Sequence, residues 1–262
     1  LNYSLRDLLG CYVISIINNI NYIYKDFINF YNYIALKVHY ILGGIVMKRK
    51  IIVANNLLEK KQYGDYTFPI DFDYNTLFAY EYGFLDYHWH YEMTFSIILE
   101  GSMEYRVNDK IYNMKKGDGL FINSHTLHTA KGYNNKDCAF LALMFRPNFI
   151  FGHEESIIKT KYIDIIENST QCPAFFLDSK NKIHQNIISI ILQASNIFYE
   201  KKSCYELLVK SKICEMWSLF FNEVSSILQD EQIFNSNDII RLSKILNFIH
   251  SNYQKKITLY DI

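Results

Sequence analysis

Between residues 93 and 145 the chain alternates apolar and polar residues, the pattern of strands that bury one face. Short turns separate the alternating stretches, with Asn108-Asp109 and Lys115–Asp118 as the clearest turn signals. Strands joined by such short turns pair antiparallel, because parallel neighbours need a crossover connection of a dozen or more residues. The pattern predicts strands at Met93–Leu99, Ser102–Val107, Lys110–Met114, Gly119–Ile122 and Cys138–Phe145.

The residues on either side of this region have a weaker pattern. Before it, Tyr66–Phe68 and Thr76–Tyr82 have the composition of strands, and Pro69 together with the polar stretch Asp71–Asn75 predicts a break between them. After it, residues 149–180 have no clear periodicity, and we expect an irregular connection there.

The C-terminal part of the chain has apolar residues at helical spacing. The spacing predicts one helix across Ile183–Phe198 and a second across Leu208–Ile227. Their apolar faces are wide enough to need a partner, which is either the sheet or a second copy of the chain. Asn235–Asn237 predicts the N-cap of a third helix at 238–253, and Thr258 predicts the N-cap of a fourth.

Three histidines are the candidate functional residues of the predicted sheet. His88 and His90 are two residues apart, so on a strand both point to one face and Trp89 points to the other. A returning strand can bring His128 near them. Such histidines either line a ligand pocket, pack as structural residues, or hold a metal ion. We expect a ligand pocket rather than a metal site, with these lining residues: His88, His90, Glu92, Tyr105 and His128.

Three stretches of the sequence match a known pattern: HWHYE at 88–92, IILEGSMEYRVNDKIYNMKKGDGLFIN at 97–123, and HTLH at 125–128. They resemble the cupin fold and, more narrowly, the N-terminal sensor domain of AraC-type transcription regulators. Residues 241–262 resemble the entry into the C-terminal DNA-binding domain of that family. The resemblance implies an α+β fold, in which an antiparallel cupin-like β-barrel (jelly roll) is followed by α-helices.

The expected domain organisation has four parts. A cupin-like sensor barrel is expected at 47–150, linker and dimerisation helices at 151–235, and the start of a helix-turn-helix domain at 236–262. The first 46 residues are predicted to be translated upstream sequence, with Met47 as the native start. A true N-terminal extension and a membrane-associated segment are the alternatives, although no run reaches the roughly 20 apolar residues of a membrane span.

The resemblance implies a regulator in which the barrel senses a small-molecule effector and the helices form a homodimer. DNA is bound through the C-terminal domain, and the sequence ends within its first helix-turn-helix unit. We therefore expect no DNA-binding residue within this chain, since such units contact bases with their second helix. The alternatives are a metal-dependent cupin enzyme, such as a dioxygenase or isomerase, and a cupin-like structural protein.

The enzyme alternative is weakened at two positions. The resemblance implies a carboxylate ligand four residues after His90, where this chain has Thr94, and a proline where it has Ser124-His125. His88, His90 and His128 are the weaker possibility of a metal site. No catalytic residue and no cofactor are expected.

The composition indicates the charge of the protein and the compartment in which it works. The 27 basic and 27 acidic residues give a formal net charge of zero, so no strongly basic surface is predicted. The five cysteines form no CxxC pair, and this odd number fits a reducing cytoplasm better than a disulfide framework. We expect a cytoplasmic protein with no membrane partner.

Overall fold

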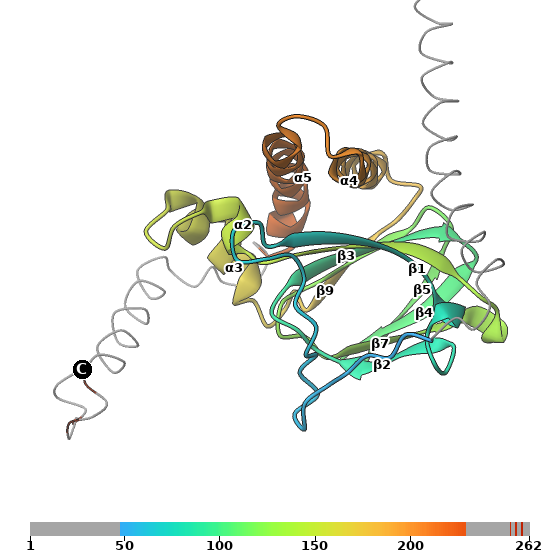
Figure 1. Cartoon of the computed structure of the whole chain (residues 1–262). Helices are drawn as coiled ribbons and strands as arrows, with labels where there is room; N and C mark the ends of the chain where they lie inside the picture. Colours follow the sequence, from blue (N-terminus) through green and yellow to red (C-terminus); the bar gives the residue numbers. More distant parts are fainter. Residues whose placement is uncertain (1–47, 229–251, 253–254, 256–257, 259–262) are drawn as a thin grey trace, which may run out of the picture. The chain divides into compact units, whose positions relative to one another are not determined.

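The computed structural model describes residues 48–228 and residues 252, 255 and 258. Within these residues, nine strands form two antiparallel sheets (Figure 1). One sheet has the strand order β1-β8-β3-β6-β9 and the other has the order β2-β7-β4-β5. The strands are β1 Ile70–Thr76, β2 Phe84–His88, β3 Met93–Glu100, β4 Ser102–Val107, β5 Lys110–Lys115, β6 Gly119–Ile122, β7 His128–Gly132, β8 Ala139–Phe145 and β9 Ala174–Leu177.

Helices and short turns of helix complete the described chain. The two long helices are α4, Lys182–Glu200, and α5, Tyr205–Leu228. The shorter elements are η1 Leu77–Ala79, η2 Tyr133–Asn135, α2 Asn148–Phe151, η3 Lys159–Ile163 and α3 Asp164–Glu167. None of the helices in the described residues is long and apolar enough to cross a membrane.

The predicted α+β fold, an antiparallel jelly roll followed by helices, is confirmed as two facing sheets with helices after them. The predicted strands at Ser102–Val107 and Gly119–Ile122 have the bounds of β4 and β6, and the other three predicted strands of that region differ from β3, β5 and β8 by a residue at one end. The turn at Lys115–Asp118 depends on Gly117, whose φ of 89° is accessible to glycine at little cost.

The predictions on either side of this region were wrong in detail. Asp71–Asn75 is not a break but part of β1, and Thr76–Tyr82 contains the 3-10 turn η1 rather than a strand. Tyr66–Phe68 forms a turn because the Asp65 carboxylate accepts hydrogen bonds from the backbone N–H groups of Thr67 and Phe68. The expected connection at 149–180 contains β9, which pairs with β6.

The two sheets differ in what covers their outer faces. Strands β4 and β5 alternate buried and exposed residues, whereas β6 and β8 are buried along their whole length. The outward Phe95, Phe121 and Phe145 explain the difference, because Trp217 of α5 packs against Phe121 and Phe145 with ring centroids about 6 Å apart. The five-stranded sheet is therefore enclosed between the inner core of the jelly roll and the helices.

Helix α4 packs on the same outer face, as the wide apolar pattern of its sequence predicted. Its N-cap is Asn181, whose side-chain oxygen accepts hydrogen bonds from the backbone N–H groups of Ile183 and His184. The ring of Phe198 lies 5.2 Å from that of Phe72 on β1, and the hydroxyls of Ser195 and Tyr74 are 2.9 Å apart. Packing on the sheet thus accounts for the inner face of α4.

The chain divides into two compact units, and the boundary between Ser218 and Leu219 lies inside α5. The first unit contains both sheets and α4, and the second includes Leu219–Leu228 of α5. The predicted helix at 238–253 and the helix expected after Thr258 lie outside the continuously described residues, and so does the segment 1–46.

Candidate functional site

Strand pairing brings the three predicted histidines together. His88 ends β2, His128 begins β7, and the two residues are directly opposite each other in the β2–β7 register. His90 follows Trp89 beyond the end of β2, so the two histidines do not share a regular strand as predicted. The ring centroid of His128 is nevertheless 4.2 Å from that of His88 and 5.0 Å from that of His90. All three side chains are buried, with at most 5% of each residue exposed.

Each of these imidazoles is held by the same kind of hydrogen bond. The Nδ1 atom of His88 lies 2.7 Å from the carbonyl oxygen of Asp86, that of His90 2.9 Å from the carbonyl of Glu92, and that of His128 2.8 Å from the carbonyl of Thr126. A carbonyl oxygen only accepts, so Nδ1 must carry the hydrogen in all three rings. The neutral rings therefore keep an unprotonated Nε2, whose lone pair can accept a hydrogen bond or bind an ion.

Burial keeps the three rings neutral. Desolvation lowers the pKa of His88 to about 4 and that of His90 to about 3, and it holds the pKa of His128 well below its usual range. A neighbouring imidazolium would disfavour a second charge, which lowers the pKa values of His90 and His128 further. At neutral pH the cluster thus presents lone pairs and no charge.

Glu92 lies beside the cluster but is directed elsewhere. Its Oε1 accepts a hydrogen bond from Nε of Arg146 at 3.2 Å. The two side chains form an ion pair, in which Glu92 is buried and Arg146 is half-exposed. Its other oxygen is 3.9 Å from Nδ1 of His90, and this contact is not an ion pair because His90 is neutral. The hydroxyl of Thr94 is instead 3.5 Å from Nε2 of His90. At the position where the resemblance implies a carboxylate, Thr94 therefore offers only a hydroxyl that contacts His90 weakly.

Tyr105 was also predicted to line the pocket, and its ring centroid lies 6.0 Å from that of His128. Tyr63 was not predicted to lie here, and its ring meets that of His90 edge-on at 5.9 Å. Tyr63 donates a hydrogen bond to the buried carboxylate of Glu59, four residues earlier. Both residues belong to the irregular segment before β1, which has no periodic pattern from which its position inside the jelly roll follows.

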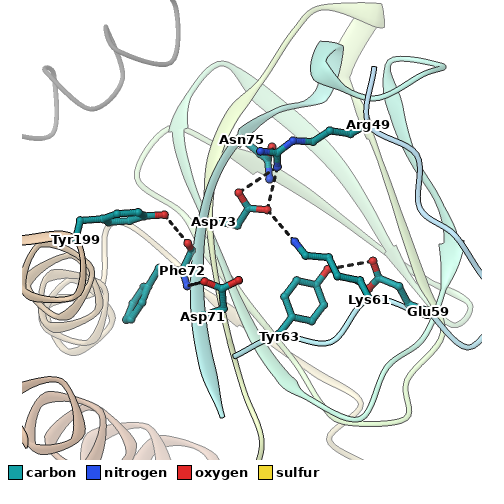
Figure 2. A network of polar contacts seen from close by, with 9 residues as sticks. All are labelled: Arg49, Glu59, Lys61, Tyr63, Asp71, Phe72, Asp73, Asn75 and Tyr199. Atoms are coloured by element: carbon teal, nitrogen blue, oxygen red, sulfur yellow. Dashed lines mark hydrogen bonds and ion pairs between the residues drawn. The ribbon is translucent and has the colours of Figure 1, made fainter. Parts of the chain in front are cut away.

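Figure 2 shows how this segment is attached to the inner side of β1. Arg49 donates hydrogen bonds to both carboxylate oxygens of Asp73 and to the side-chain oxygen of Asn75. Lys61 forms an ion pair with Asp73 at 3.4 Å and lies over the ring of Tyr63. These partners explain why polar residues occur at alternate positions of β1, where the sequence predicted a break between strands.

The cluster can accept one electrophilic ligand. Three neutral imidazole lone pairs in an apolar surrounding can coordinate a transition-metal ion or accept hydrogen bonds from a small polar molecule. His88, His90 and His128 are the residues that could hold such an ion, and the nearest carboxylate, Glu92, is ion-paired with Arg146.

A surface hollow of about 430 Å³ lies apart from this cluster. It is lined by Glu104 and Arg106, which flank the inward-facing Tyr105 on β4, and by Tyr82 and Phe84. The hollow is therefore on the outer face of the four-stranded sheet, and none of the five predicted pocket residues lines it.

Comparisons with known proteins identify the family of the jelly-roll domain. Residues 71–189 match the model of the AraC-like ligand binding domain, and this range includes His88, His90, His128 and Arg146. The chain is 28% identical over 215 residues to the uncharacterized HTH-type transcriptional regulator YdeC of Bacillus subtilis, a match that covers 82% of this chain and 72% of YdeC. The chain thus contains a domain similar to the AraC-like ligand binding domain. Its sensor domain is the cupin-like jelly roll.

Solved structures with similar parts cover little of this regulator. KdgF from Halomonas sp. is 19% identical, and a predicted oxalate decarboxylase from Thermotoga maritima is 30% identical. Each match covers 24% of this chain and 57% or 56% of the other chain, with a TM-score of 0.23.

Glu59 generates a prediction about stability. Burial raises its pKa from 4.5 to about 7, although the hydrogen bond from Tyr63 acts in the opposite direction. Because the folded protein then binds more protons than the unfolded chain between pH 4.5 and 7, its stability falls as the pH rises through this window. Glu59→Gln removes the ionisable group and therefore this loss of stability. The free energy of unfolding of the variant minus that of the parent chain should be about 2 to 3 kcal/mol greater at pH 8 than at pH 5.

Chemical denaturation of both chains at the two pH values measures this difference. Glu154→Gln is the matched control, since the Glu154 side chain is 80% exposed and should show almost no pH-dependent difference. Equal pH profiles for Glu59→Gln and the parent chain would show that the Glu59 carboxyl is not buried as described.

Proposed function

We propose that the jelly roll of this AraC-type regulator senses a small ligand at His88, His90, Glu92, Tyr105 and His128. The observation that carries the proposal is the cluster of three inward, neutral imidazoles within a domain of the AraC-like ligand-binding family. Polar groups cost free energy when they are buried, unless a partner satisfies them. Three buried imidazoles side by side are therefore better explained by a ligand than by packing alone.

Sensing is favoured over catalysis by the residues around the cluster. A cupin enzyme of the expected kind needs a carboxylate next to its histidines, and here Thr94 has that place. Glu92 is close, but its ion pair with Arg146 directs it away from the Nε2 side of His90. The proposal therefore assigns the cluster a binding role and assigns it no reaction.

Strand β1 offers a route from the pocket to the helices. On one face, Asp73 and Asn75 bind Arg49 of the N-terminal segment, which also contains Tyr63 beside His90. On the other face, Phe72 and Tyr74 contact α4, where the hydroxyl of Tyr199 donates to the carbonyl of Phe72 (Figure 2). A ligand that moves Tyr63 would shift this segment and, through β1, the position of α4.

DNA binding is assigned to the helix-turn-helix region that the sequence predicts from residue 236 onward. Effector and DNA would then be coupled through α4 and α5, with a coupling free energy of the usual size for allosteric proteins, about 1–3 kcal/mol. No residue of the two sheets is assigned to DNA.

A DNA selection followed by a reporter assay tests the regulator proposal. The product of the complete gene is expected to enrich one sequence from random DNA at physiological salt and to bind it at least about 10³-fold more tightly than random DNA. A reporter under that sequence should change by about tenfold across a panel of growth conditions. His128→Ala should hold the reporter at one level, because its imidazole is lost from the cluster.

The matched control is His125→Asn, since His125 is exposed and its positive φ is one that asparagine tolerates. This variant should respond as the parent does. Failure to enrich any sequence would contradict a DNA-binding function, whereas a His128→Ala reporter that still responds would contradict sensing at the cluster.

We also propose that the regulator is a homodimer that uses exposed apolar residues of the helices. Leu207 and Leu208 near the start of α5 are 70% and 49% exposed. Single exposed apolar residues are common, but two adjacent exposed leucines indicate a surface that a partner covers.

Light scattering and sedimentation across a dilution series measure the assembly. We expect a dimer at micromolar concentration that becomes a monomer in Leu207→Glu/Leu208→Glu, because two charges would be buried at the interface. Ile111→Glu is the control, since Ile111 is 42% exposed and lies on β5 of the four-stranded sheet. A parent chain that is monomeric at micromolar concentration would refute the proposed dimer.

A further inference from the structure

We propose that the hollow on the outer face of the four-stranded sheet is a second small-molecule site, which takes a planar aromatic compound with one carboxylate group. This site is separate from the histidine cluster and goes beyond the proposed function, because it adds a ligand of another class. Three features of the hollow lead to it: its size, its aromatic rings, and an arginine whose charge has no partner among the described residues.

Three strands form the floor of the hollow. Glu104 of β4 is paired with Lys131 of β7, which is paired in turn with Phe84 of β2. Arg106 and Thr129 form the next outward pair of β4 and β7. These side chains point away from the jelly-roll core, because their neighbours along each strand point into it. The volume of about 430 Å³ is within the range of small-molecule sites.

Four aromatic side chains line this hollow. They come from η1, from β2 and from the turn between them, and between 38% and 57% of each residue is exposed: Phe78, Tyr82, Phe84 and Tyr87. The rings of Tyr82 and Phe84 are stacked, with centroids 5.8 Å apart and planes inclined by 30°. The solvent face of an antiparallel sheet is normally polar, and apolar groups that gather at one hollow indicate a binding site. The flat faces of the rings suit a planar, apolar ligand.

Arg106 supplies the charge that selects the ligand. Its side chain is half-buried, and within the described part of the chain it has neither an ion-pair nor a hydrogen-bond partner. Lys131, in contrast, is paired with Glu104 at 3.1 Å. A guanidinium that is partly withdrawn from water is well satisfied by a carboxylate, because its N–H groups can hold both oxygens of that group.

Glu104 limits the charge that the ligand can carry. It lies on the same face of β4 as Arg106, two residues earlier, and its carboxylate would repel a doubly charged phosphate group more strongly than a single carboxylate. Lys136, an exposed residue of the lining, adds a flexible cation that favours an anion without fixing its position. The site therefore fits a monoanion whose aromatic part rests on Tyr82 and Phe84.

Naphthoate is the probe, because it joins one carboxylate to a flat aromatic ring system. NMR titration of the 262-residue chain at neutral pH should give one site with a Kd of about 1 mM or lower. Naphthylmethanol and naphthylmethylamine have the same rings with a neutral or a positive group, and each should bind at least about 10-fold more weakly. Intermolecular NOEs from naphthoate should reach the rings of Tyr82 and Phe84.

An arginine variant tests the charge. Arg106→Gln keeps a polar side chain but removes the guanidinium, so it should weaken naphthoate at least about 10-fold and leave the affinity for naphthylmethanol unchanged. Lys115→Gln is the matched control, since Lys115 is an exposed cation on β5 of the same sheet that does not line the hollow. This control should bind all three probes as the parent does.

A tyrosine variant tests the aromatic wall. Tyr82→Ser removes a stacking ring and should weaken all three probes by about threefold or more. Tyr66→Ser is its control, since Tyr66 is 91% exposed and does not line the hollow.

Several outcomes would overturn the site. On the unaltered chain, these are equal affinities for naphthoate and naphthylmethylamine, or NOEs confined to rings outside the hollow, and neither result depends on the folding of a variant. A folded Arg106→Gln variant that binds naphthoate as the parent does would have the same consequence. An affinity that falls as the protein concentration rises would show that a second copy of the chain covers the hollow. The reporter assay with His128→Ala concerns the histidine cluster and is independent of all these results.

Discussion

The pairing of β2 with β7 places His88 directly opposite His128, and the rest of the site depends on this register. A shift of one residue in either strand would turn one of the two imidazoles to the outer face of the sheet. His90 joins them from the irregular residues after β2, where its Nδ1–H bond to the carbonyl of Glu92 fixes the ring. Three separate local hydrogen bonds then direct the remaining nitrogens inward, so the backbone of the jelly roll itself sets the chemistry of the pocket.

The same fold connects the interior to the exterior through one sheet. The five-stranded sheet is covered on its inner face by the core around Tyr63 and Tyr105, and on its outer face by α4 and by Trp217 of α5. A sheet packed on both sides transmits small displacements, because close-packed interiors yield little. Strand β1 is the most direct connection, since alternate residues bind the N-terminal segment and α4. In the proposed function, sensing thus depends on how a buried site changes the fit of helices on the opposite face.

Sequence reasoning found the elements whose pattern is local. The alternation in β4 and β5, the apolar runs of β3, β6 and β8, and the helical spacing of α4 and α5 each follow from contacts that bury one or both faces of the element. Strand β1 was missed because Asp73 and Asn75 resemble turn residues until Arg49, more than 20 residues away, is known to satisfy them. The convergence of the histidines was predictable from their two-residue spacing and the returning strand. Their tautomers, the Glu92–Arg146 ion pair and the position of Tyr63 were not, since each depends on backbone geometry or on contacts between distant segments.

Three neutral imidazoles each present one ring nitrogen within 4.8 Å of the other two, and their Nε2 atoms are unprotonated. Nitrogen-15 NMR of the histidine rings in the metal-free chain at neutral pH measures this most directly, with the signals assigned by His88→Ala, His90→Ala and His128→Ala. The account predicts that all three rings are neutral and carry their hydrogen on Nδ1. A charged ring, or a ring with its hydrogen on Nε2, at any of the three positions would contradict it.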